Sequence, residues 1–185
     1  MHTEVHVHGT VSLRNGVTQA EVEQALRPWL EYVDVDGLGD ARSAIQDEPG
    51  IVFDRRRRAV EICWTGYVGR NFQNSLEAAF QLLSPYSEEA AAVEVSYYHE
   101  DGQDEHGWAF VGPTPESIQD MQRRRLIDDV SAMLARHFGE AEIGEVSALL
   151  NQLFARRGPM SAATTTDTER DHPRSVRISG KKHLH

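Results

Sequence analysis

The sequence predicts an α+β fold: a ferredoxin-like β-α-β-β-α-β antiparallel sheet with helices on one face, followed by a C-terminal helical hairpin and a flexible tail. Three observations predict it. Apolar and polar residues alternate in five short segments, which is the period of strands, and recur every three or four residues in four others, which is the period of helices. After residue 157 the chain has few large apolar side chains. We therefore expect a sandwich domain over 1–112, a helical hairpin over 113–157 and a disordered tail over 158–185.

The opening residues predict a strand and then a helix. Two sets of residues alternate along the strand: Thr3, Val5, Val7, Gly9, Val11 and Leu13 on one face, and His2, Glu4, His6, His8 and Thr10 on the other. Asn15-Gly16 indicates a turn, and Thr18 followed three residues later by Glu21 indicates a capping box that opens the helix. Pro28 should kink or shorten its last turns.

The remaining segments complete the predicted sheet. GIVFD (50–54) and AVEICWTG (59–66) indicate two strands joined by four arginines, and a helix begins near Arg70 or Asn71 and ends at Pro85. AAVEVSYYHE (91–100) indicates a fourth strand, and WAFVG (108–112) an additional edge strand. The acidic, glycine-containing loop over 34–50 has a length that is typical of a lid or binding loop.

The residues after Pro113 indicate two helices. Thr114-Pro115 is typical of an N-cap followed by a first-turn proline, and it precedes an amphipathic segment that ends at Gly139. A second apolar periodicity runs from Ile143 to Phe154. Together they predict a helical hairpin.

Composition excludes several classes of function. One cysteine among 185 residues cannot form an internal disulfide, and the chain has neither an apolar run of the ~20 residues that span a bilayer nor a signal-peptide pattern. We therefore expect a cytoplasmic protein without membrane contact. Residues 1–157 carry 14 basic and 26 acidic side chains, which argues against nucleic-acid binding. Both lysines follow residue 157, so a P-loop or Schiff-base lysine is excluded from the body.

The alternating histidines raise a choice between a metal site and a polar sheet face. A ferredoxin-like order places the first strand centrally, so His6 and His8 should look toward Glu61 and Glu94 on its neighbours. Imidazole and carboxylate ligands suit zinc or another divalent transition metal. The alternative, a polar face with no cofactor, needs only hydrogen bonds between the same groups. We favour that alternative.

Several other residues are candidates for an interface or an anion site. The predicted open face also carries His2, Glu4 and Tyr98, and it is too apolar for plain solvent surface and too polar for a core, which indicates coverage by the hairpin, a second copy or a partner. Four arginines, Arg55, Arg56, Arg57 and Arg58, lie at the predicted hairpin tip. Arg70 lies at a strand-to-helix connection that could hold an anion.

One stretch of sequence resembles a known group of proteins. EPGIVFD followed by EICWTGYVGRNF is similar to small uncharacterised α+β proteins encoded by bacteriophages and prophages, over about residues 3–112. The resemblance transfers no function. It implies that binding host proteins is more common for such a chain than catalysis.

Three functions are therefore carried forward. The first is a non-enzymatic interaction or regulatory module that acts through its polar sheet face or its helical hairpin as a homodimer. The second is an acidic inhibitor that masks a basic surface of a host protein. The third is a metal-dependent enzyme with a His/Glu site on the sheet, which requires an open coordination position in a pocket.

Overall fold

The computed structural model describes residues 3–100 and 102–157, so His2 and the predicted tail over 158–185 lie outside the described residues. The strands are β1 Thr3–Ser12, β2 Gly50–Asp54, β3 Ala59–Val68, β4 Ala91–Tyr98 and β5 Glu105–Val111. The helices are α1 Gln19–Ala25, α2 Arg27–Tyr32, α3 Phe72–Leu83, α4 Pro115–Leu134 and α5 Glu140–Arg157, with short 3-10 turns at Leu38–Asp40 and Ser84–Tyr86.

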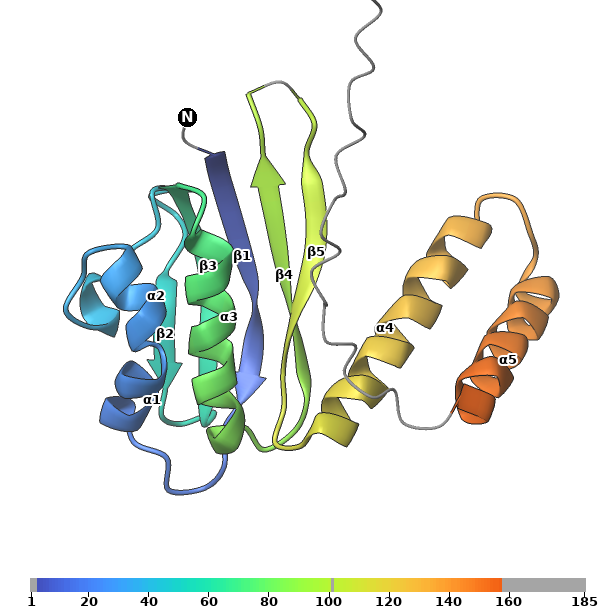
Figure 1. Cartoon of the computed structure of the whole chain (residues 1–185), viewed down its shortest axis with the longest axis horizontal. Helices are drawn as coiled ribbons and strands as arrows, with labels where there is room; N and C mark the ends of the chain where they lie inside the picture. Colours follow the sequence, from blue (N-terminus) through green and yellow to red (C-terminus); the bar gives the residue numbers. More distant parts are fainter. Residues whose placement is uncertain (1–2, 101, 158–185) are drawn as a thin grey trace, which may run out of the picture.

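The five strands form one open antiparallel sheet in the order β2-β3-β1-β4-β5. Without β5, this is the strand order of a ferredoxin-like sheet, and β5 adds an edge strand beside β4. The helices α1, α2 and α3 cover one face of the sheet (Figure 1). The predicted fold class is confirmed.

Local sequence accounts for where the helices begin and end. The capping box predicted for Thr18 and Glu21 is present at the start of α1. Pro28 does more than kink this helix, because the chain divides at Leu26 and Pro28 lies in the first turn of a separate α2. At α4, Thr114 caps the helix and Pro115 occupies its first turn, as expected.

The core lies between the sheet and α1–α3. Trp29 is fully buried at its centre, with edge-to-face contacts to Trp64, Phe72 and Phe80 at ring-centroid distances of 5.5 to 6.1 Å. Gly66 makes room for one of these rings, because a Cβ at this position would lie 2.4 Å from the indole of Trp64. The sheet domain thus has a continuous aromatic and aliphatic core of its own.

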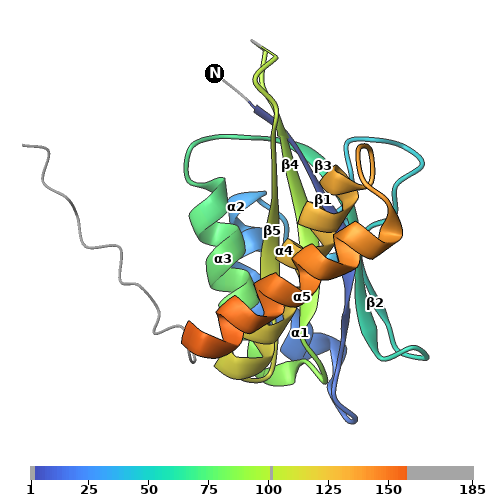
Figure 2. The same cartoon turned by 90° about the vertical axis from the view of Figure 1, so that its right-hand side faces the viewer.

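The hairpin stands beside the sheet instead of folding over it. The helix α4 contacts β4 and β5, and the guanidinium of Arg125 lies 3.7 Å from the ring centroid of Trp108 on β5. The helix α5 packs on α4, and a 3.2 Å hydrogen bond joins the hydroxyls of Ser131 and Ser147 between them. Figure 1 shows both helices beyond the β5 edge, and in Figure 2, which views the molecule from that side, they lie in front of the strands. None of the helices in the described part of the chain combines the length and the apolar character needed to cross a bilayer.

Candidate functional site

The sheet face opposite α1–α3 carries its side chains in rows, because residues paired across antiparallel strands point to the same face. Reading across β3, β1, β4 and β5, the rows are Tyr67–Glu4–Tyr98, Thr65–His6–Ser96–His106, Cys63–His8–Glu94–Trp108 and Glu61–Thr10. We call this surface the open face. Polar and titratable groups occupy its middle, over β1 and β3.

A hydrogen-bond network fixes His6 on this face. Its Nδ1 lies 2.9 Å from the hydroxyl oxygen of Thr65 and 3.5 Å from a carboxylate oxygen of Glu48. The Thr65 hydroxyl donates to Glu48 over 2.8 Å. A hydroxyl has one proton, so toward His6 the Thr65 oxygen can only accept, and Nδ1 must carry the ring proton. The lone pair of neutral His6 therefore lies on Nε2.

Glu48 anchors this network from the loop between α2 and β2. Both Ser43 and Thr65 donate their hydroxyls to the same carboxylate oxygen of Glu48. Burial acts to raise the pKa of Glu48, but these two hydrogen bonds and the nearby His6 and His8 outweigh it and hold the pKa below its ordinary value. Glu48 is consequently an anion, and its carboxylate lies beside His6 and Thr65 on the open face.

Cys63 lies directly opposite His8 across the β1–β3 pair. The thiol is free and half-buried, and burial together with the charge of Glu48 raises its pKa. Metal-ligating atoms of His6, His8 and Cys63 all lie within 4.8 Å of one another. The two imidazoles are nearly parallel, with ring centroids 6.0 Å apart.

The two carboxylates expected near the histidines have different positions. Glu94 on β4 lies opposite His8, on the side away from Cys63. Glu61 lies one row further along the open face, opposite Thr10, and its carboxylate accepts a hydrogen bond from Arg57 over 2.7 Å. The structure therefore places Glu94 in the row of His8 and commits Glu61 to an ion pair.

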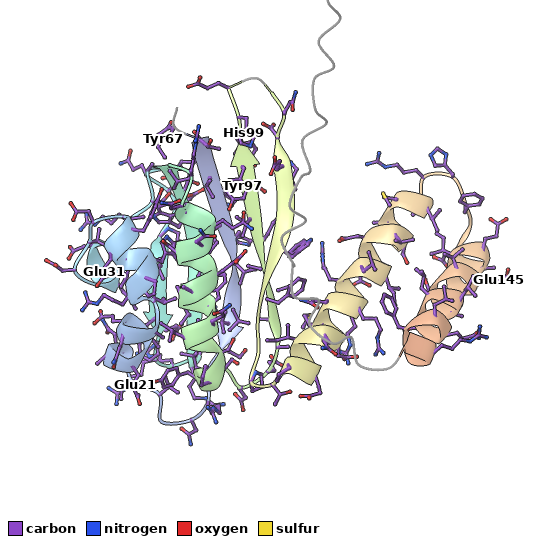
Figure 3. All side chains as sticks on the ribbon, viewed as in Figure 1. Glu21, Glu31, Tyr67, Tyr97, His99 and Glu145 are labelled. Carbon is purple, nitrogen blue, oxygen red and sulfur yellow. The ribbon has the colours of Figure 1, made fainter. Side chains whose placement is uncertain are left out.

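The aromatic end of the open face brings together two of the predicted interface residues. Glu4 lies between Tyr67 and Tyr98, and Tyr67 is hydrogen-bonded to Glu4, which raises the pKa of the phenol. These tyrosines are 67% and 40% exposed. Figure 3 shows Tyr67 and His99 at the same end of the sheet. His2, the remaining residue of this set, is outside the described residues.

The arginine candidates do not converge on one site. Arg55 and Arg56 are exposed at the turn between β2 and β3. Arg57 pairs with Asp54 and Glu61, and Arg58 lies 3.7 Å from a carboxylate oxygen of Glu88. Arg70 is exposed before α3, far along the chain from this turn. Two of the five arginines thus already have acidic partners.

Sequence reasoning left Glu48, Ser43 and Thr65 out of the candidate site. Thr65 carries a usable signal, because its alternation with Cys63 puts it on the open face. Glu48 and Ser43 come from the loop over 34–50, and no periodicity fixes where such a loop folds back. Cys63 carries the same signal, because it lies two residues from Thr65 on the same strand.

The hairpin forms a second candidate surface. No residue of α4, and none of α5 up to Arg156, is fully buried. Val146, Leu149 and Leu153 are 37%, 55% and 47% exposed on α5, with the spacing of a single helical stripe. We call these three residues the α5 stripe. On α4, Leu126 and Met133 are 47% and 65% exposed.

Both exposed sets point away from the seam between α4 and α5. Ser131 and Ser147 mark the facing sides of α4 and α5, and Arg125 marks the side of α4 that faces the sheet. At about 100° per residue, Leu126 and Met133 lie about 140° and about 160° from the side of α4 that faces α5, and the α5 stripe lies about 100–160° from the side of α5 that faces α4. The same geometry puts Glu145 at the outer edge of α5, where Figure 3 shows it.

Comparison with known proteins identifies a family but no activity. A family model described as a family of unknown function, DUF6806, matches residues 3–155. The match extends beyond the 3–112 of the phage resemblance and includes the hairpin. Neither the curated proteins nor the solved structures gave a match.

Proposed function

This chain belongs to the DUF6806 family, whose function is unknown, and from the hairpin geometry we propose that it is a non-enzymatic interaction module that homodimerises through α5. The observation that carries the proposal is the exposed α5 stripe. Exposed apolar side chains at helical spacing form an apolar patch along α5, and such patches mark interaction sites.

The charges on α5 favour a second copy of the chain as the occupant. Glutamates lie at the start of the helix, and arginines lie at its end. In a two-fold, antiparallel pair of α5 helices centred on Leu149, residue 142 of one copy lies opposite residue 156 of the other. Glu142 then meets Arg156 of the partner subunit at both ends of the interface, because both side chains are exposed and flank the stripe.

The stripe itself fits this arrangement. Its spacing of three and then four residues is the repeat with which helices interdigitate along a shallow crossing. About Leu149, Val146 lies near Leu153 of the partner subunit, and Leu149 meets its own copy on the axis. In this arrangement the apolar side chains of one α5 therefore face those of the other, and the charged ends are paired as well.

Solution mass tests the proposal directly. Light scattering on the full chain should give twice the 20.8 kDa of one chain. Leu149→Glu puts two like charges on the two-fold axis and should give a monomer. The matched control is Ala148→Glu, which adds the same charge to an exposed residue of the same helix outside the stripe and should remain dimeric.

Two results would contradict the proposal. A wild-type chain that stays monomeric at tens of micromolar would exclude the homodimer. A dimer that survives Leu149→Glu, but dissociates when Tyr98 on the open face is changed to Glu, would move the interface to the sheet. Far-UV circular dichroism confirms in each case that the variant is folded.

A further inference from the structure

We propose that His6, His8 and Cys63 bind one zinc ion on the open face. The inference is independent of the proposed dimer, because the three residues lie on β1 and β3 of the sheet domain and none is on the hairpin.

The three side chains come together without any long loop. His6 and His8 share a face of β1, since they are two residues apart on a strand, and the β1–β3 register sets Cys63 directly opposite His8. Their ligand atoms lie within 4.8 Å of one another. Ligands of a tetrahedral zinc are about 3.5 Å apart, given bonds of about 2.1 Å to nitrogen and about 2.3 Å to sulfur. Rotation of the exposed His8 side chain can supply the difference.

The surroundings of His6 match those of a metal-bound histidine. Metal-binding imidazoles use one ring nitrogen for the metal and donate the other N–H to an oxygen that fixes the ring. Here Nδ1 is committed to the Thr65 hydroxyl, which in turn donates to Glu48, so Nε2 keeps its lone pair. This network leaves Nε2 as the ring nitrogen of His6 that can bind the ion.

The local charges and ligand types favour zinc. Two imidazoles and a thiolate suit zinc better than calcium or magnesium, which prefer oxygen ligands. Binding requires the Cys63 thiol to release its proton to solvent, and the thiolate and the Glu48 anion together balance the two positive charges of the ion. With three protein ligands, the fourth position is left for water.

The expected ligand set differs from one based on the two carboxylates of the open face. Glu61 is held by Arg57, and Glu94 is in the row of His8 but outside the cluster of three. Glu94→Gln is therefore a matched control: it changes a polar residue of the same face and leaves all three ligands in place.

Cobalt binding to the full chain, with zinc competition, tests the site. Co(II) titration of reduced, metal-free protein should give one equivalent bound, with a thiolate-to-cobalt charge-transfer band and the intense visible bands of a tetrahedral ion, which zinc then removes. Cys63→Ser should abolish the charge-transfer band, and His8→Ala should weaken binding at least 100-fold. Glu48→Gln should weaken it by about 10- to 100-fold through His6. Glu94→Gln and His137→Ala, a change to an exposed histidine of the hairpin, should bind within about twofold of wild type.

The outcomes that overturn the site are equally definite. Absence of a charge-transfer band in wild-type protein would exclude coordination by Cys63. Equal loss of binding in Glu94→Gln and Cys63→Ser would refute the assigned ligand set. His8 is exposed, so His8→Ala should fold normally, and circular dichroism of this variant keeps the test valid if Cys63→Ser is unstable.

Discussion

The sheet domain and the helical hairpin follow the same patterning rules, but their apolar side chains end in different environments. On α3, the apolar stripe of Phe72, Leu76, Ala79, Phe80 and Leu83 is buried against the sheet. On α5, the stripe of Val146, Leu149 and Leu153 faces water. Every buried apolar residue of the described chain lies at or before Val111. Equal periodicity thus predicts that an apolar face exists, and it does not say what covers that face.

The difference implies that the two regions are not equally stabilised by their own internal contacts. Burial of a leucine-sized side chain contributes about 1.5–3 kcal/mol, and the sheet domain contains many such residues around Trp29. The hairpin has its partly buried helix–helix seam and its contacts with the β5 edge, and it gains stability when its exposed stripe is covered. We therefore expect the sheet domain to be stable by itself and the hairpin to depend on association.

The largest expected effect is on the free energy of unfolding, when one core residue of the sheet domain is removed and the result is compared with a change on the hairpin. Trp29→Ala deletes the ring that contacts Trp64, Phe72 and Phe80, and it should lower the free energy of unfolding by about 3–5 kcal/mol. Leu149→Ala, on the α5 stripe, should leave the unfolding of the sheet domain unchanged. Urea denaturation monitored by tryptophan fluorescence and circular dichroism measures both. A loss of stability in Leu149→Ala as large as in Trp29→Ala would mean that the two regions unfold as one unit.

The sequence predicted the fold well because, in the sheet domain, the local sequence signals agree with the elements that form. The capping box at Thr18, the stripe of α3 and the strand alternation of β1 each determine an element and the face it buries. Once the order of strands and helices is known, few ways of connecting them into a sheet remain. The prediction fell short at Pro28, where the helix divides in two instead of bending, since a proline tolerated in a first turn can start a new helix.

The candidate site was predicted only in part, because alternation fixes neither the register of paired strands nor the path of a long loop. Alternation puts His6 and His8 on one face of β1, and Glu61 and Cys63 on one face of β3. The pairs His8–Cys63 and Thr10–Glu61 also depend on the register of the two strands, and a shift of two residues would keep the same faces but change the pairs. Glu48 reaches His6 from the loop between α2 and β2, whose path follows from tertiary contacts. The pattern therefore located the face, and the structure was needed to locate the cluster.

A second prediction concerns hydrogen exchange at different protein concentrations. If the α5 stripe is covered by association, amides of α5 should become at least about tenfold more protected as the concentration rises through the dissociation constant of the dimer. Amides of β1, at the centre of the sheet, should not change. Exchange measured by mass spectrometry at two concentrations gives both values in one experiment. Protection of α5 that is independent of concentration would show a hairpin that is stable without a partner.

The smallest expected effect tests the antiparallel direction of the pairing. Glu142→Arg alone, or Arg156→Glu alone, replaces an attraction at each end of the interface by a repulsion, and each should weaken the dimer by roughly three- to tenfold, because exposed ion pairs contribute little. The double variant Glu142→Arg/Arg156→Glu restores both pairs with the charges exchanged and should recover most of the affinity. Sedimentation equilibrium at low and high salt measures the constants, and salt should reduce the differences between variants. Additive weakening in the double variant would reject the antiparallel arrangement, since only a partner in that orientation brings residues 142 and 156 of two copies together.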